Sequence, residues 1–210
     1  MDIIEKIFNA VVEGNVDDTI LAVEKALAEE GFSASDVLSK GLIPAMDLVG
    51  EKFAEAEYFI PQVLWSAKAM QGAMDLLKPH LTKDRQEERN TVVIGTARGD
   101  IHDIGKNLVA IMLEGAGYRV IDLGVDVSPE TFVEAALENK ARIIAVSALL
   151  TTTMQAMAEV VDRVREKKDH SLKVLIGGAP VDSAFCEEIG ADAYGIDAVD
   201  GVSKVKELMG

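Results

Sequence analysis

Residues 91–107 read TVVIGTARGDIHDIGKN: an apolar run, then a polar loop that holds a histidine, then the start of a helical pattern. The run from Thr91 to Thr96 is typical of a buried strand, and the pattern at 106–114 is typical of a helix. In an open parallel sheet, the loop between a strand and a helix lies at the carboxyl edge, where ligands bind. His102 can coordinate a metal there through one ring nitrogen, while Asp100 accepts the proton of the other. The sequence therefore predicts a ligand site at the end of this strand.

Strands and helices continue to alternate after this segment. Apolar runs predict strands at 91–96, 119–123, 141–147, 173–176 and 193–195. Helical spacing predicts helices at 106–114, 129–138, 153–167, 183–189 and 199–209. Strands that are apolar without clean alternation are typical of a parallel sheet covered on both faces. We therefore expect an α/β domain at 89–210 with a flavodoxin-like, Rossmann-type, five-stranded parallel sheet.

The preceding residues have a helical character instead. Ile3, Ile7 and Val11 recur at helical spacing, and further helical patterns run from Asn15 or Asp17 to Glu30 and over 34–40, 45–55 and 61–77. About four or five helices with short connections predict a small antiparallel bundle, which we place at residues 1–88. Residues 78–90 are polar and charged, and we expect an exposed linker there.

Composition narrows the class of protein. The chain has 21 basic and 36 acidic residues, and its net charge of −15 disfavours binding to nucleic acid or to an anionic membrane surface. Its only cysteine, Cys186, can form no intrachain disulfide and is expected to pack inside a helix. Neither a long apolar span nor the basic start of a signal peptide is evident, so we expect a cytoplasmic protein.

Two further motifs follow the histidine loop at fixed spacing. The 41 residues 106–146 separate Gly105 from Ser147-Ala148-Leu149, and the 27 residues 150–176 separate that motif from Gly177-Gly178. This pattern resembles the Asp-x-His-x-x-Gly, Ser-x-Leu and Gly-Gly signature of cobalamin-binding proteins that hold the cofactor base-off and His-on. The resemblance covers nearly the whole chain, because the helical half is similar to the cap of methionine synthase and of corrinoid methyl-carrier proteins.

The resemblance implies that His102 is the lower axial ligand of cobalt and that Asp100 and Thr153 form a proton relay to it. Methionine synthase has serine at the position of Thr153, so the hydroxyl is kept. Local sequence also allows plainer roles. Asp100 or Asp103 could cap the helix at 106–114, Thr152 or Thr153 could cap the helix at 153–167, and His102 could simply bond to a helix start.

Other matching positions would surround the corrin ring and its displaced nucleotide tail. Gly105 would let the helix start approach the ring, and Asn107 could donate to a ring amide or lie on a plain helix surface. Phe59, Val63 and Met70 are candidates for a lid, although helical-core spacing equally explains the last two. The full set of expected cofactor-binding positions is Phe59, Val63, Asp100, His102, Asp103, Ile104, Gly105, Asn107, Ser147, Leu149, Thr153, Gly177, Gly178 and Ala179, with Pro180 at the rim.

The function implied is that of a corrinoid protein, non-catalytic alone, that binds a cobamide and shuttles a methyl group on cobalt. A substrate-specific methyltransferase would supply the group, and a second methyltransferase would pass it to tetrahydrofolate, a tetrahydropterin or coenzyme M. A reductive activator is a further expected partner. Methanol, methylamines, betaines and methoxylated aromatics all fit as donors, and the sequence gives no physical basis for choosing among them.

Two other cobalamin-dependent functions stay open at this stage. A light or ligand sensor shares the cap and the binding domain but usually adds a DNA-binding region, and none is evident before the bundle. The small subunit of a carbon-skeleton mutase generally lacks the helical cap. Methyl or aquo cobalt in the purified protein would favour the carrier, whereas an adenosyl ligand would favour the sensor or the mutase.

Overall fold

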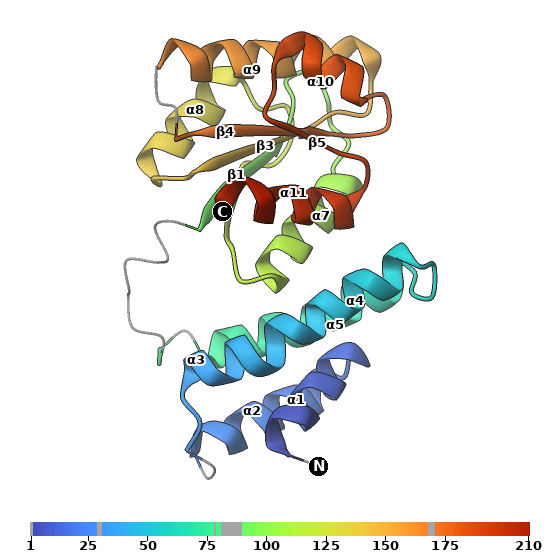
Figure 1. Ribbon diagram of the computed structural model, residues 1–210, viewed down its shortest axis with the longest axis vertical. Coiled ribbons are helices and arrows are strands. Elements are labelled where there is room, and N and C mark those ends of the chain that lie inside the picture. The colour runs from blue at the N-terminus through green and yellow to red at the C-terminus, as the bar shows by residue number, and fades with distance from the viewer. Residues whose placement is uncertain (1, 29–30, 78, 81–89, 168–170) are drawn as a thin grey trace. The chain divides into compact units, whose positions relative to one another are not determined.

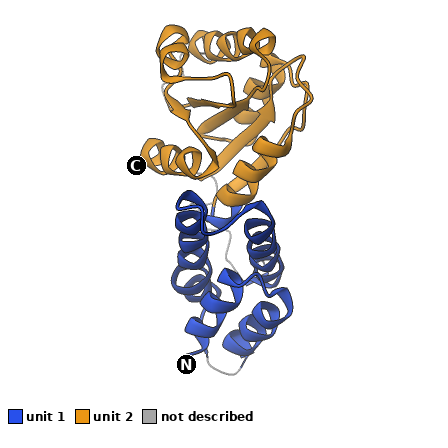
Figure 2. Cartoon of the chain, turned by 90° about the vertical axis from the view of Figure 1, so that its right-hand side faces the viewer, with its two compact units in different colours: residues 1–84, 114–117 blue, residues 85–113, 118–210 orange. Residues whose placement is uncertain are grey.

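The computed structural model describes residues 2–28, 31–77, 79–80, 90–167 and 171–210. The chain forms two compact units, coloured blue and orange in Figure 2: residues 1–84 with 114–117, and residues 85–113 with 118–210. The predicted domain boundary between residues 88 and 89 falls outside the described residues and stays a prediction. The same holds for most of the predicted linker at 78–90.

The N-terminal unit is helical, as the apolar spacing predicted. Its α1, α2, α4 and α5 pack on one another, and Ile7, Val23, Val49 and Val63 contribute fully buried side chains to the core between them. Burial of such aliphatic faces, more than helix propensity, stabilises helices of this length. The elements are α1 (Ile3–Val12), α2 (Val16–Ala28), α3 (Ala34–Val37), the π-helical turn η1 (Leu38–Leu42), α4 (Ile43–Ala54) and α5 (Ile60–Leu77).

The predicted break between residues 40 and 45 was wrong, because α3, η1 and α4 form one continuous helical run. Gly41 and Pro44 favoured a break in the sequence. In the structure the backbone N–H of Ile43 donates to the carbonyl of Leu38, five residues earlier, which is the bonding of a π turn. Pro44 then falls in the first turn of α4, where a missing N–H is tolerated.

The second unit is built on a parallel sheet whose strand order is β2-β1-β3-β4-β5. This is the flavodoxin-like order of a doubly wound sheet, so the predicted fold class is confirmed. The strands are β1 (Thr91–Thr96), β2 (Arg119–Asp122), β3 (Ile143–Ser147), β4 (Lys173–Gly177) and β5 (Ala193–Gly195). The helices are α7 (Ile104–Gly115), α8 (Pro129–Glu138), α9 (Met154–Glu166), α10 (Ser183–Ile189) and α11 (Ala198–Met209), with a 3₁₀ turn, η2 (Thr151–Thr153).

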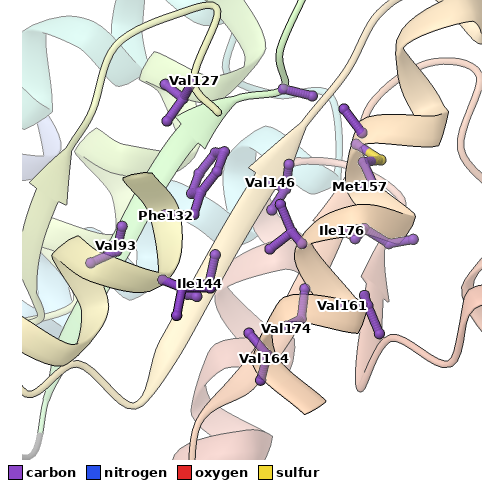
Figure 3. Close-up of a cluster of buried hydrophobic side chains, with 14 of the residues drawn as sticks. Val93, Val127, Phe132, Ile144, Val146, Met157, Val161, Val164, Val174 and Ile176 are labelled. Atoms are coloured by element: carbon purple, nitrogen blue, oxygen red, sulfur yellow. The ribbon is translucent and has the colours of Figure 1, made fainter. Parts of the chain in front are cut away.

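Helices cover both faces of this sheet, with α8, α9 and α10 on one face and α7 and α11 on the other (Figure 1). One core of this unit lies under α8 and α9, where Phe132, Met157 and Val161 pack on Ile144 and Ile176 of strands β3 and β4 (Figure 3). The layering explains why the strands β1, β3 and β4 are mostly apolar, because both of their faces are largely buried.

Cys186 lies buried in α10, as predicted, and it is a free thiol. Burial raises the pKa of this thiol, with smaller contributions from Glu187 and Asp192. A buried thiol of raised pKa is a poor nucleophile, so Cys186 belongs to the core rather than to a reactive site.

Among the described residues, no helix combines the length and the hydropathy that a membrane crossing requires. The longest, α5, has 18 residues but includes Gln62, Lys68 and Asp75 along its length.

Candidate functional site

His102 lies on the loop between β1 and α7, at the carboxyl edge of the sheet. Its side chain is 47% exposed, and its Nδ1 lies 2.7 Å from Oδ1 of Asp100, whose own side chain is fully buried. The backbone N–H of His102 donates to the same oxygen at 3.1 Å, and Thr96 Oγ1 donates to the carbonyl of His102 at 3.0 Å. The loop therefore holds both the backbone and the ring of His102 in one orientation.

Asp100 connects this loop to the next one along the sheet. Its Oδ2 accepts hydrogen bonds from the backbone N–H of Leu149 at 2.7 Å, from that of Leu150 at 3.2 Å and from Thr153 Oγ1 at 2.9 Å. Burial alone would raise the pKa of Asp100, but the hydrogen bonds from Leu149, His102 and Thr153 outweigh it and hold the pKa well below its usual range. Asp100 is thus a buried, ionised carboxylate.

The charge of Asp100 determines which nitrogen of His102 is available. An ionised carboxylate only accepts hydrogen bonds, so Nδ1 of the neutral ring must carry the proton. Nε2 then keeps its lone pair, and it has no hydrogen-bond partner within the described residues. Histidines that ligate a metal commonly have a carboxylate partner that fixes the ring tautomer in this way.

The hydroxyl of Thr153 lies within hydrogen-bond distance of two acceptors, Asp100 and Leu150. Its hydroxyl lies 2.9 Å from Asp100 Oδ2 and 2.8 Å from the carbonyl of Leu150, and its one proton can be donated to only one of them at a time. Its side chain makes no capping bond to α9, so the alternative role as a helix cap was wrong. Asp100 likewise bonds to His102, Leu149, Leu150 and Thr153 rather than to the first turn of α7.

The Ser-x-Leu and Gly-Gly motifs lie side by side on the same edge. Ser147 ends β3 opposite Thr96 of β1 on one side and Gly177 of β4 on the other. Gly178 has a φ of +128°, and a Cβ on it would lie 1.9 Å from the carbonyl oxygen of Ala148. Only glycine fits there, because the two loops touch through their backbones. The two loops are therefore packed backbone to backbone at this edge.

Helix α7 begins with a polar cluster. Lys106 is 2% exposed, and its Nζ donates to Asn107 Oδ1 at 2.5 Å and pairs with Asp122. Asn107 Nδ2 donates to Asp103 Oδ2 at 3.1 Å. The second N–H of Asn107 Nδ2 and the second lone pair of its Oδ1 are the groups that it can offer to a ligand. Nothing lies within 4 Å of a Cβ added at Gly105, so the helix start is open to one.

The sequence reasoning missed an apolar rim on this edge. The loops after β1, β2, β3 and β5 all expose aliphatic side chains, and only Leu149 and Ile104 among them were predicted as site residues. A signal was present, since aliphatic residues stand directly after strands where turns are normally polar. The rim consists of Ile101 (74% exposed), Ile104 (75%), Val125 (38%), Leu149 (45%), Leu150 (41%) and Ile196 (73%).

The expected lid residues in the helical unit differ in exposure. Val63 and Met70 are 0% and 2% exposed, so both lie in the bundle core, as the alternative interpretation allowed. Phe59 is 63% exposed at the start of α5. It is accompanied by exposed Ile60, Leu64 and Trp65, which the sequence reasoning did not single out.

The donor set fits a metal that brings its own ring of ligands. No group of three or more histidine, cysteine, aspartate or glutamate side chains in the described parts of the chain could hold a bare ion. A single imidazole beside an apolar rim suits a large macrocycle instead, since the ring needs apolar surface and the metal needs one axial nitrogen. The residues present therefore fit a corrinoid.

Comparison with known proteins agrees with this geometry. Residues 90–203 and residues 3–78 each match a B12 binding domain family. Two proteins of Methanosarcina acetivorans are similar over 99% of this chain: monomethylamine corrinoid protein 2, at 43% identity over 98% of its length, and trimethylamine corrinoid protein 1, at 42% over 97%. The methanol:cobalamin methyltransferase complex MtaBC from Methanosarcina barkeri contains a similar chain, with a TM-score of 0.89 and 32% identity over 99% of this chain and 79% of that one.

These matches extend over both units. The chain belongs to the B12-binding family of corrinoid proteins, and its cofactor is a cobalamin or a related cobamide.

Proposed function

We propose that this protein carries a methyl group, on the cobalt of its cobamide, from a substrate-specific methyltransferase to a second methyltransferase. The observation that carries the proposal is the pairing of His102 Nδ1 with the buried, ionised Asp100, which leaves Nε2 available to cobalt. When bound, the cofactor supplies a cobalt centre that can accept a methyl group and release it.

His102 is proposed to replace the cofactor's own base as the lower ligand. The displaced nucleotide tail would then lie against the loops formed by Ser147-Ala148-Leu149 and Gly177-Gly178-Ala179, where the glycines would let a flat base approach the backbone. The rim residue Ile104 and the open start of α7 at Gly105 would lie under the ring, and Asn107 would donate to a side chain of the ring.

Asp100 and Thr153 are proposed to control the proton of His102. While Nε2 binds cobalt, Asp100 keeps the proton on Nδ1 and so keeps the ring neutral. Were Nε2 not bound to the metal, its lone pair would be free, and the carboxylate of Asp100 would still hold the proton on Nδ1. Thr153 can add or withdraw its hydrogen bond to Asp100, because Leu150 offers it a second acceptor.

The proposal also gives a role to the helical unit and includes the location and the partners of the protein. The helical unit, taken as residues 1–88, would act as a cap in which Phe59 contacts the cofactor; Val63 would support it from the bundle core. We place the protein in the cytoplasm and include a reductive activator among its partners. Relatives are named for monomethylamine and trimethylamine, and methylamines are therefore the first donors to test.

The test is the transfer of an isotopically labelled methyl group. Full-length protein is loaded with a cobamide, reduced, and incubated with labelled monomethylamine, trimethylamine or methanol and an extract of cells grown on that donor. Label recovered on the protein-bound cofactor, and its loss when an acceptor fraction is added, is the expected result. Recovery of an adenosyl ligand from the native protein, with no labelled methyl from any donor, would favour the sensor or the mutase instead.

His102→Ala and His80→Ala form the matched pair of variants for this assay. His80 is exposed and belongs to the other unit, so its loss controls for removal of an imidazole from the surface. Labelling is expected to fail with His102→Ala and to persist with His80→Ala.

A further inference from the structure

Asp126, in the loop between β2 and α8, touches the histidine loop twice. Its Oδ1 accepts the backbone N–H of Gly99 at 2.7 Å, and its own backbone N–H donates to the carbonyl of Asp100 at 2.9 Å. The two bonds bracket the Gly99–Asp100 dipeptide, which only Ile101 separates from His102. No part of the site described above uses Asp126.

The backbone of Asp126 lies in a conformation that aspartate rarely adopts. Its φ is +54°, in the left-handed region that costs free energy for a residue with a Cβ. Such a conformation persists only where the surroundings fix it, and it is commonest near functional sites. Glycine would adopt this φ freely but would lack the carboxylate, so the contact with Gly99 gives a physical reason for aspartate here.

The same loop runs beside the start of the histidine loop. Thr96 N–H donates to the carbonyl of Gly124 at 2.9 Å, Val127 N–H donates to the carbonyl of Thr96 at 3.0 Å, and Ala97 forms a bridge with Val127. These bonds place Asp126 against Gly99 whatever its own side chain does. Its carboxylate adds a bond that fixes the direction of the next peptide.

Asp100, on the loop after β1, is therefore held by the loops that follow both neighbouring strands, β2 and β3. The loop after β2 fixes its backbone through Asp126, and the loop after β3 fixes its carboxylate through Leu149 and Leu150. The N–H of Asp100 also donates to the carbonyl of Ala97 at 3.0 Å, and the bonds from Asp126 further limit a rotation of this backbone that would redirect the bond from His102 Nδ1 to Asp100 Oδ1.

We propose that Asp126 is a positioning residue for His102, which acts by fixing Gly99 and Asp100 so that the imidazole presents Nε2 in one direction. Its importance for cobalt binding rests on the function proposed above. The orientation of His102 by Asp126, however, is expected in the cofactor-free protein as well. Loss of a partner that orients a metal-binding histidine commonly weakens metal affinity by about 10–100-fold. Because Asp126 acts through Asp100, we expect the lower end, about 10-fold.

The experiment compares Asp126→Gly with Asp126→Asn in the full-length protein. Glycine accommodates the positive φ and removes the acceptor, whereas asparagine tolerates the φ and keeps an oxygen that can accept from Gly99. In the cofactor-free protein, Asp126→Gly should speed amide exchange at Gly99 by about 10-fold or more and mix the ring tautomers of His102, as read by ¹⁵N NMR. Asp126→Asn should restore most of the wild-type behaviour.

Asp192→Ala is the control for a purely structural effect. Asp192 precedes β5 and accepts the backbone N–H of Val174 at 2.8 Å near the start of β4, at the amino edge of the sheet. Its loss should lower stability without changing the tautomer of His102. In cob(II)alamin-loaded protein, Asp126→Gly should bind the cofactor about 10-fold more weakly.

Unchanged Gly99 exchange and an unchanged His102 tautomer in Asp126→Gly would overturn the positioning role. The proposed function fails separately, if loaded wild-type protein keeps the cofactor's own base on cobalt. The NMR comparison in cofactor-free protein still decides the role of Asp126 in that case.

Discussion

At the scale of single residues, Asp100 and Thr153 should not contribute equally to cofactor binding. Asp100 accepts the hydrogen bond from His102 Nδ1 as a charged carboxylate. Thr153, in contrast, has one hydroxyl proton to donate either to Asp100 or to the carbonyl of Leu150. We expect Asp100→Asn to weaken cobamide affinity by about 10–100-fold and Thr153→Val to weaken it less. Titration followed by visible absorbance measures both. Equal effects, or a larger one from Thr153→Val, would contradict the hierarchy.

Asp100 should also make stability depend on pH in the acid range. Its pKa in the folded protein lies well below the ordinary value of 3.8, so the folded state binds its proton less readily than the unfolded state. The resulting stabilisation is present above about pH 5 and is lost as pH falls toward the folded pKa. Urea unfolding should show Asp100→Asn to be less stable than wild type at pH 7, by about 1–3 kcal/mol, with the gap closing at lower pH. A gap that widens on acidification would refute this assignment.

Only some of the residues at the carboxyl edge of the sheet could be predicted from the sequence. The spacing of the motifs identified His102, Asp100 and Gly178, because each has a backbone or tautomer requirement that few residue types meet. Asp126 and Ile196 carry no such motif. Their roles depend on which loops the strand order brings together, and a single sequence does not specify loop contacts.

At the scale of elements, α7 is tied to the end of β2 by a buried charge. Lys106 is 2% exposed and pairs with Asp122, whereas Arg163 and Glu130 on α9 and α8 form a pair that is about half exposed on both sides. Removing the partner of a buried charge costs more than removing the partner of a solvated one. Chemical unfolding should show a loss of about 1–3 kcal/mol for Asp122→Asn and at most about 1 kcal/mol for Glu130→Gln. Equal losses would mean that Lys106 is satisfied without Asp122.

The bounds of the helices and strands were predicted best where an apolar run or a cap residue marks each end. β1, α8, α10 and β5 begin and end where the sequence predicted, since apolar runs or cap residues bound each of them. Ser128, for example, accepts the N–H of Thr131 at the start of α8. The π turn at Leu38–Leu42 could not be predicted, because Gly41 and Pro44 favour a break as much as a change of helix type.

At the scale of the whole molecule, exposed aliphatic residues mark the carboxyl edge of the sheet as a binding surface. Ile101 is 74% exposed there, and Leu137, 44% exposed near the end of α8, serves as a control outside that edge. We expect Ile101→Ser to leave unfolding stability nearly unchanged but to weaken cobamide affinity by about 10-fold, because burial of an isoleucine side chain stabilises by about 1.5–3 kcal/mol. Leu137→Ser should change the affinity little, as measured by the same absorbance titration. An equal loss from both variants would rule out a specific rim.

Electron paramagnetic resonance can show directly whether His102 Nε2 binds the cobalt. Full-length protein carrying ¹⁵N-labelled histidine is loaded with unlabelled cob(II)alamin and studied by electron paramagnetic resonance. We expect superhyperfine splitting from one ¹⁵N nucleus in the wild-type protein. The His102→Ala variant should lose this splitting, and the His80→Ala variant should keep it. Splitting from ¹⁴N in the wild type, which would place the cofactor's own base on cobalt, would contradict it.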